Sequence, residues 1–292
     1  MNDVLSFGSM VLNSSTSILF GALGILLMQL AGVMNIGAEG MMLIGAFAGY
    51  IGSIMTGSAW LGGIFAAVVT GIVGILYAFC TIQMKANQVV VGIALNIFAS
   101  GLTTTFYRVI FGMGSSSVKA DSFAQAGPFS IPVYGGIALV ALLTFLLYKT
   151  KVGLKVRGVG ENPVAIDSMG LHVNRIRYIS VIVGSMIIGF GGAFLSLGEL
   201  SFFTEDMVSG RGYIALAAVI FGRYTPVGTW LAVLVFGAGE ALVYKFQAMS
   251  VGVPTQVILM IPYVLTILVV AIFGQKGSGP KALGIPFVKG EK

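Results

Sequence analysis

The feature that most restricts how this chain can fold is a basic, polar stretch at residues 149–177, which lies between two apolar halves. This stretch, the basic island, reads KTKVGLKVRGVGENPVAIDSMGLHVNRIR and carries six of the sixteen basic residues, against two acidic residues, Glu161 and Asp167. So polar a segment does not enter hydrocarbon, and the positive-inside bias keeps a basic segment between membrane spans on the cytoplasmic side. The island therefore predicts a membrane protein with a cytoplasmic loop near its middle.

The composition agrees with this interpretation. Of the 292 residues, 57% are hydrophobic and 9% are charged, whereas a soluble domain carries about 25% charged residues. We expect an all-α, polytopic membrane protein in which residues 1–292 form a single transmembrane domain with a cytoplasmic tail at residues 274–292. The net charge of +6 does not indicate nucleic-acid binding, because ten of the sixteen basic residues lie in the island and in the tail. The first residues lack a basic region, and we expect no cleavable signal peptide.

Apolar runs predict nine crossings of the membrane. A spanning helix needs about 20 apolar residues, and fewer where it is broken or buried in protein. The runs that meet this expectation are residues 14–33, 41–55, 60–82, 89–111, 133–148, 176–197, 213–221, 229–246 and 257–273. Several of them are short or interrupted by glycine.

The charges predict the orientation of these spans. If the short run 213–221 crosses the membrane, four segments separate the island from the tail, and both lie in the cytoplasm. If that run is re-entrant, three crossings remain, and the four lysines of the tail lie outside, against the positive-inside bias. We therefore favour nine crossings with the N-terminus outside.

Glycine is unusually frequent, with 42 residues, about twice the usual share of ~7%. In the second run, Gly45, Gly49 and Ser53 recur at four-residue spacing, and the run 176–197 is also dense in glycine. Small residues let helices approach closely within a membrane. The spacing predicts a tight helix contact along the second span.

The break between the first two spans, NIGAEG at residues 35–40, holds the first candidates for a functional site. A broken helix exposes backbone N–H and C=O groups, which membranes tolerate only against protein or a water-filled cavity. Asn35 and Glu39 in this break, with Gln29 before it and Asn96 in the fourth span, are candidates to line a polar path for a hydrogen-bonding solute. Alternatively, the break is a tight cytoplasmic turn, and Glu39 caps the helix that follows.

Glu240 is a further candidate for the pathway, because it lies in the middle of the eighth span. Ionisable side chains at membrane depth are costly and are usually functional. The alternative, which we favour, is an internal hydrogen bond or a contact with another chain. The spans show no clear pairs of opposite charges, which argues against coupling to an ion gradient.

The residues that catalysis would need are missing from the spans. His172 is the only histidine and lies in the island, which excludes a histidine-based triad or a multi-histidine metal site within the membrane. Cys80 is the only cysteine, so no disulfide forms within the chain. The G-x-x-x-x-G-K-[ST] motif of nucleotide-binding loops is absent. We therefore expect a transport protein rather than an enzyme, with no cofactor or metal of its own.

Within the island, residues 161–171 predict a short helix. Asn162 can cap it, Pro163 stands where a missing N–H does no harm, and Gly170 can end it. Its apolar side chains indicate a docking element for another protein at the cytoplasmic surface. A solvated connecting loop is the alternative.

Three stretches together resemble the permease subunits of ABC importers for ribose, galactose, nucleosides and branched-chain amino acids. Residues 32–50, GVMNIGAEGMMLIGAFAGY, are similar to the N-I-G-x-E-G segment of that family. Residues 160–177 resemble its G-x-N-x-x-A-A-x-x-x-G-I loop, with Ile166 at the second Ala and Leu171 at the Ile. Residues 210–230 resemble its G-x-G-[YF]-x-A-I-A-V-A-x-[LF]-G segment. The three stretches follow the family's order.

The resemblance implies how such a chain works. Residues 160–171 would be the coupling helix that enters a cleft of a separate cytoplasmic ATPase, and an extracellular binding protein would deliver the solute. The residues of the motif that carry this coupling role are Gly160, Glu161, Asn162, Pro163, Ala165 and Gly170. The resemblance also implies a multi-pass protein of the bacterial plasma membrane.

The run ANQVVVGIALN at residues 86–96 is most similar to the nucleoside branch of the family. In that branch two unlike permeases pair, and this chain resembles the shorter partner; the binding protein is a lipoprotein in Gram-positive bacteria. Two alternatives stay open. The solute is a simple sugar such as ribose or galactose, or the chain is a stand-alone secondary transporter or channel that needs no ATPase.

Overall fold

A computed structural model describes residues 2–112, 118–248, 255–258 and 279–288, together with residues 260, 262, 264 and 267. Apart from loops and one small hairpin, the described chain is helical, which confirms the all-α prediction. Seven helices in this part of the chain are long and apolar enough to cross a membrane. They are α1 (Asn2–Leu30), α2 (Ala38–Thr56), α3 (Ala59–Ala78), α4 (Gln88–Phe111), α5 (Ile131–Lys149), α8 (Val173–Phe194) and α10 (Pro226–Ala248).

The remaining elements are short. One π-helical turn each extends α3 and α8, and a two-stranded antiparallel hairpin precedes α5. The short helices are α6 (Lys151–Glu161), α7 (Pro163–Ser168), α9 (Arg211–Phe221) and α11 (Thr255–Ile258), the π turns are η1 (Phe79–Gln83) and η2 (Leu195–Glu199), and the strands are β1 (Gln125–Ala126) and β2 (Phe129–Ser130).

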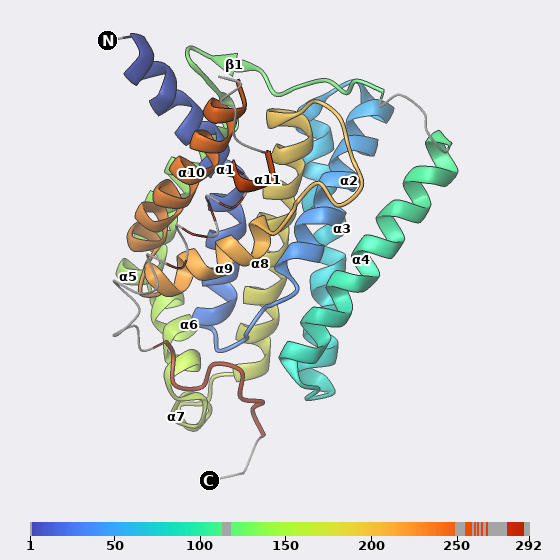
Figure 1. Ribbon diagram of the computed structural model, residues 1–292. Helices are drawn as coiled ribbons and strands as arrows, with labels where there is room; N and C mark the ends of the chain where they lie inside the picture. Colours follow the sequence, from blue (N-terminus) through green and yellow to red (C-terminus); the bar gives the residue numbers. More distant parts are fainter. Residues whose placement is uncertain are drawn as a thin grey trace.

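The first eight predicted spans coincide with α1, α2, α3, α4, α5, α8, α9 and α10. The ninth, residues 257–273, lies largely outside the described residues. Figure 1 shows the N-terminus and the hairpin at one end of the bundle, the N-terminal end, and α6, α7 and the last described residues at the other, the island end.

The doubtful seventh segment runs from one end of the bundle toward the other. Its preceding loop starts near the N-terminal end, where the Ala120 amide donates to the Ser201 carbonyl at 2.9 Å. The loop then descends to the middle of the bundle, where α9 begins (Figure 1). Beyond α9, Tyr224 lies against Gly279, next to the residues that contact the island. A loop and a half-length helix together thus replace a full span.

The described residues of the tail, 279–288, lie at the same end as the island, as the charge argument requires. The amide of Ala282 donates to the carbonyl of Gly160 at 2.8 Å, and the amide of Gly284 donates to that of Gly32 at 3.1 Å. Residues 279–288 therefore pack against the ends of α1 and α6.

The island differs from the polar loop that we predicted. Residues 151–161 form α6, because Gly153, Val156 and Gly160 recur at helical spacing and are buried together. The following helix, α7, is shorter than predicted, but the Asn162 side chain caps it as expected, accepting from the Ala165 amide at 3.0 Å. Arg177 is not a solvated island residue: it lies in α8 with 1% of its surface exposed.

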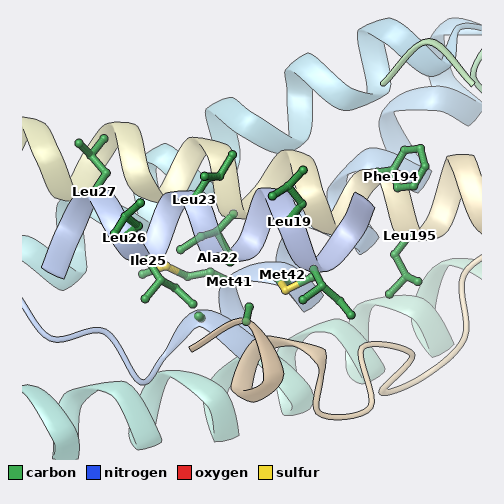
Figure 2. Close-up of a cluster of buried hydrophobic side chains, with 14 of the residues drawn as sticks. Leu19, Ala22, Leu23, Ile25, Leu26, Leu27, Met41, Met42, Phe194 and Leu195 are labelled. Carbon is green, nitrogen blue, oxygen red and sulfur yellow. The ribbon is translucent and has the colours of Figure 1, made fainter. Parts of the chain in front are cut away.

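The hydrophobic core lies where α1, α2 and α8 meet, and Figure 2 shows its leucine and methionine side chains. Buried side chains surround α1: 78% of its apolar stretch is buried, against 17% for α4. The chain is therefore built around its first helix, and α4 is the peripheral one.

The glycine stripe of α2 makes the predicted close contact. A Cβ atom on Gly45 would lie 2.6 Å from the Cα of Gly189, and one on Gly49 would lie 3.1 Å from the Cα of Ala193. Both partners belong to α8. Ser53 does not join this contact; its hydroxyl donates to the Asp121 carbonyl at 3.3 Å.

We expect Gly45→Val to destabilise the protein, because the new side chain has no space between α2 and α8. Overpacking of this kind costs about 1–3 kcal/mol or more. The matched control is Gly135→Val in α5, where nothing lies within 4 Å of the added Cβ. Thermal unfolding in detergent, followed by size-exclusion chromatography, measures the difference. Equal stability of the two variants would contradict the contact.

Candidate functional site

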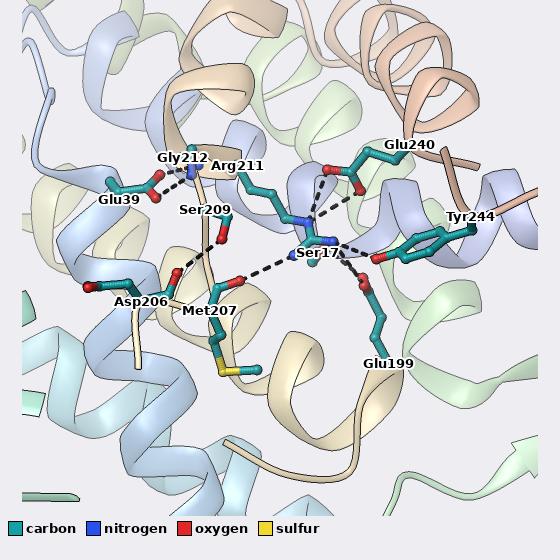
Figure 3. A network of polar contacts seen from close by, with 11 residues as sticks. Ser17, Glu39, Glu199, Asp206, Met207, Ser209, Arg211, Gly212, Glu240 and Tyr244 are labelled. Atoms are coloured by element: carbon teal, nitrogen blue, oxygen red, sulfur yellow. Dashed lines mark hydrogen bonds and ion pairs between the residues drawn. The ribbon is translucent and has the colours of Figure 1, made fainter. Parts of the chain in front are cut away.

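The polar centre of the molecule is the N-terminus of α9, residues 210–213, which read GRGY. Through their backbone or side chains, these four residues contact α2, α4, α10 and the π turn η2. Figure 3 shows the acidic and polar side chains that gather around it.

Glu39, in the first turn of α2, binds the backbone of α9. Its two carboxylate oxygens accept from the amides of Gly210 at 2.6 Å and Gly212 at 2.7 Å. The first amides of a helix have no partners within the helix, and the helix dipole favours a negative charge there. A side chain at position 212 would collide with the backbone of Glu39, and Gly210 has a φ of +88°. The two glycines therefore allow this contact.

The structure contradicts the tight-turn interpretation of the NIGAEG break, whereas the polar path stays a prediction. Residues 31–37 do not form a tight turn. They form a connection from the island end to the middle of the bundle, where α2 begins (Figure 1). Glu39 is a capping residue, but it caps α9 and not its own helix. Sequence reasoning missed this because the partner lies 171 residues away.

Asn96, on α4, caps α2. Its Oδ1 accepts from the Gly40 amide at 2.8 Å, and its Nδ2 donates to the Ile36 carbonyl at 3.1 Å and to the Tyr213 hydroxyl at 2.8 Å. The structure thus brings Asn96 and Glu39 together at the point where α2, α4 and α9 meet.

Asn35 lies in the same break but faces the core. It is fully buried, and its Nδ2 points to the sulfur atoms of Met28 at 3.1 Å and Met41 at 3.4 Å. Its Oδ1 has no hydrogen-bond partner among the described residues, and neither has the Oε1 of Gln29. Asn35 is therefore near Glu39 in sequence but not part of the same polar cluster.

Glu240 pairs with Arg211, which corrects the expectation that the spans hold no paired charges. The Nε of Arg211 donates to the two oxygens of Glu240 at 3.1 and 3.3 Å, and its Nη2 lies 3.5 Å from Glu199. Tyr244 accepts a further bond from Nη2 at 3.1 Å, and Ser17 donates to Glu199 at 2.8 Å.

This charge cluster is buried, with 10% of the Arg211 and Glu199 side chains and 12% of the Glu240 side chain exposed. Burying a guanidinium is costly unless carboxylates and hydrogen bonds surround it. The favoured prediction for Glu240, an internal bond, therefore agrees with the geometry. Arg211 and Glu199 were missed because they lie between the predicted spans 176–197 and 213–221; the signal was an arginine between the two glycines of GRG.

The loop before α9 is tied to α4. Arg108 makes a bidentate ion pair with Glu205, in which each hydrogen bond is 2.7 Å long. Ser100 donates to Asp206 at 2.7 Å. The hydrogen bonds from Arg108 hold the pKa of the Glu205 carboxyl below its usual value.

Chemically, the centre is polar: it holds three carboxylates, of Glu39, Glu199 and Glu240, and one guanidinium, of Arg211. Glu39 lies on a helix N-terminus, and Arg211 lies between two carboxylates. The Tyr213 ring, 48% exposed, and Asn96 border this centre. Such an arrangement can offer hydrogen bonds and an aromatic face to an uncharged solute. No group of three histidine, cysteine or acidic residues suited to a metal ion occurs in the described part of the chain.

The residues predicted to couple to an ATPase lie at the island end. Gly160 is buried against the end of α1, whereas Glu161, Asn162 and Gly170 are exposed. Pro163 opens α7, Ala165 bonds to Asn162, and Gly170 has a φ of +77° after the helix ends. No residue of α7 is buried, and the helix projects from the bundle (Figure 1).

Comparison with known families gives a match over most of the chain. The model of the family described as branched-chain amino acid transport system / permease component matches residues 8–270. No solved structure matches the chain.

Curated relatives include three that are similar over most of their length. The guanosine ABC transporter permease protein NupQ of Bacillus subtilis is 34% identical over 93% of this chain and 92% of its own. The nucleoside ABC transporter permease protein NupC of Lactococcus lactis is 32% identical over 94% of each chain. The putative glucose ABC transporter permease protein TsgC13 of Haloferax volcanii is 34% identical over 85% of this chain and 81% of its own.

We expect Arg211→Met to destabilise the protein far more than Glu240→Gln. The first change strands two buried carboxylates, which costs about 3–5 kcal/mol. The second leaves Arg211 paired with Glu199 and costs about 1–2 kcal/mol for the lost bond. Thermal unfolding measures both, with Arg108→Met at the exposed pair as control. If Glu240→Gln lowered the stability as much as Arg211→Met, the result would contradict the pairing of Arg211 with Glu199 as well as with Glu240.

Proposed function

The chain belongs to the branched-chain amino acid transport system / permease component family, and we propose that it forms part of the solute pathway of an ATP-driven importer. It is a multi-pass protein of the bacterial plasma membrane and a transport subunit. In this proposal a separate cytoplasmic ATPase hydrolyses ATP, a second, longer permease completes the pathway, and an extracellular binding lipoprotein delivers the solute.

The observation that carries the coupling to an ATPase is the exposed apolar surface of α7. Val164 is 45% exposed and Met169 is 73% exposed, although both are apolar and lie next to charged island residues. A short, well-capped helix that projects from the bundle with apolar side chains outward suits insertion into a cleft of another protein. Residues 160–171 are the segment that we assign to this contact, within one permease domain over residues 1–292.

The peripheral position of α4 supports a second permease. Only 17% of its apolar stretch is buried, yet it carries Asn96 and Arg108, which belong to the polar site. A polar site bordered by a helix with few neighbours in its own chain is suited to completion by another subunit.

The charges of the site, three carboxylates and one arginine, favour a neutral solute over an anionic one. Glu39, Arg211 and Glu240 are each engaged by partners within the chain, so the described residues offer no free cation to a phosphate or carboxylate there. NupQ and NupC, whose names give guanosine and nucleosides, are similar over nearly the whole chain. A nucleoside is therefore the solute that we propose; a simple sugar is the second candidate, since TsgC13 is a putative glucose permease.

Asn35, Glu39, Asn96 and Glu240 have different roles in this proposal. Asn96, together with Tyr213, borders the path and contacts the solute. Glu39 and Glu240 act through α9: they hold the half-helix in place and stay bonded within the chain. Asn35 supports the core beside the break.

We expect Val164→Glu combined with Met169→Glu to abolish association with the ATPase while the protein still folds, because both side chains are exposed. The test is affinity purification from native membranes followed by mass spectrometry, in which the unchanged chain should bring an ATPase and a second permease. Met55→Glu is the matched control. Met55 is also apolar and 78% exposed, but it lies near the C-terminal end of α2 and not at α7. Undiminished recovery of the ATPase with the double variant would contradict the role of α7.

We expect reconstituted transporter to take up guanosine and uridine but not the corresponding monophosphates. Tyr213→Ala should raise the half-saturating nucleoside concentration about tenfold, since stacking of a base on an aromatic ring contributes roughly 1–3 kcal/mol. Tyr213→Phe keeps the ring and should have the smaller effect. Uptake of ribose or glucose in preference to nucleosides, or equal effects of the two variants, would count against a stacked base.

A further inference from the structure

Four parts of the chain meet at the island end: the end of α1, the end of α6, the start of α8, and residues 279–288, which we call the strap (Figure 1). Three hydrogen bonds join them. The strap donates from Ala282 to Gly160 at 2.8 Å and from Gly284 to Gly32 at 3.1 Å, and Arg177 of α8 donates from Nη1 to the carbonyl of Ile285 at 2.9 Å.

Arg177 is the unusual member of this junction. Its side chain is 1% exposed, and no carboxylate among the described residues lies within ion-pair distance of it. It lies beside Gly32, just after the C-terminal end of α1, where the helix dipole favours a positive charge. Its one hydrogen bond, from Nη1 to Ile285, joins α8 to the strap, and its Nε and Nη2 have no hydrogen-bond partner among the described residues.

The junction is also closely packed. A Cβ atom on Gly160 would collide with the carbonyl of Leu30, so the end of α6 lies directly on the end of α1. Gly32 and Gly284 have φ values of +83° and +78°, which form the two turns that face each other. There is little room for α6 to move without α1 and the strap.

From this junction a continuous set of contacts leads to the polar site. Residue 34 is held on both sides, since its amide donates to Gln88 at 2.6 Å and its carbonyl accepts from Tyr77 at 2.7 Å. Two residues later, Asn96 binds Ile36 at 3.1 Å, and Glu39 then binds α9. The start of the strap also touches Tyr224, which follows α9.

We propose that the strap and Arg177 make α6–α7 and the α1–α2 connection move as one body, so that a displacement of α7 reaches α2 and α9. Arg177 is thus a positioning residue for energy coupling. This inference rests on the proposed function, because it requires an ATPase that acts on α7. Contiguity alone does not demonstrate coupling, so the test measures solute transported per ATP hydrolysed.

The first experiment weakens the junction in the complete reconstituted transporter. In Arg177→Met the bond to the Ile285 carbonyl is lost, and we expect ATP hydrolysis to continue while the solute transported per ATP falls about fivefold or more. Arg177→Lys keeps the positive charge, and its solute-to-ATP ratio should lie between those of Arg177→Met and the unchanged chain. Lys281→Ala, on the exposed side of the strap, is the matched control and should transport normally.

The second experiment restores the junction covalently. A Cβ on Gly284 would lie 4.0 Å from that of Met34, within the range of about 3.5–4.5 Å that disulfides span. We therefore expect Met34→Cys with Gly284→Cys, in a Cys80→Ser background, to form a disulfide. Oxidation should raise the solute-to-ATP ratio of Arg177→Met toward that of the unchanged chain, and reduction should reverse this. The single Gly284→Cys variant is the control.

The outcomes separate this inference from the proposed function. If no ATPase copurifies with the unchanged chain, the proposed function fails. If the ATPase is present but Arg177→Met lowers hydrolysis and transport in proportion, or the disulfide blocks transport by the otherwise unchanged chain, the strap does not transmit movement and the inference is wrong. A lower ratio that oxidation restores supports it.

Discussion

The carboxylate of Glu39 on the N-terminus of α9 is the interaction on which the rest of the structure depends. Two chain segments, one from each end of the bundle, stop being helical and meet at its middle. Each break leaves backbone groups unpaired, and such groups in hydrocarbon cost several kcal/mol each. Glu39 and Asn96 satisfy amides of α9 and α2, so both breaks become stable at the same place. Arg211 then finds its carboxylates because α9 is held there.

The charges of the molecule have two distinct uses. Around α9 they bond to one another and to backbone amides, and they fix helices that would otherwise be too short or too polar to stay in the membrane. At the island end, Arg177 donates to one backbone carbonyl in place of a carboxylate, and the strap provides it. The two regions are joined by the connection from α1 to α2, which lets a helix that projects from the bundle communicate with a site in its interior.

Local signals in the sequence predicted the elements, and long-range contacts decided the site. Apolar runs located the spans, Asn162 and Pro163 located the start of α7, and the spacing of Gly45 and Gly49 identified a contact face. Asn96 and Glu39 were singled out because polar groups in apolar runs need partners. Those partners, Arg211, Glu199 and Tyr213, were not predictable. They are distant in sequence, and because they lie in or beside a polar loop, the pattern of apolar runs does not single them out. Arg177 was misassigned because composition does not distinguish a solvated arginine from a buried one.

The separation between Glu39 and its partners has a consequence for biosynthesis. The bond to Gly210 spans 171 residues, so at about 5–20 residues per second the ribosome makes Glu39 roughly 10 to 30 seconds before α9 exists. With 11 residues, α9 is also shorter than the ~20 that insert as an independent span. The nascent protein must therefore keep this carboxylate away from hydrocarbon until α9 is made, and α9 enters the bilayer only where Glu39 is already in place to bind it.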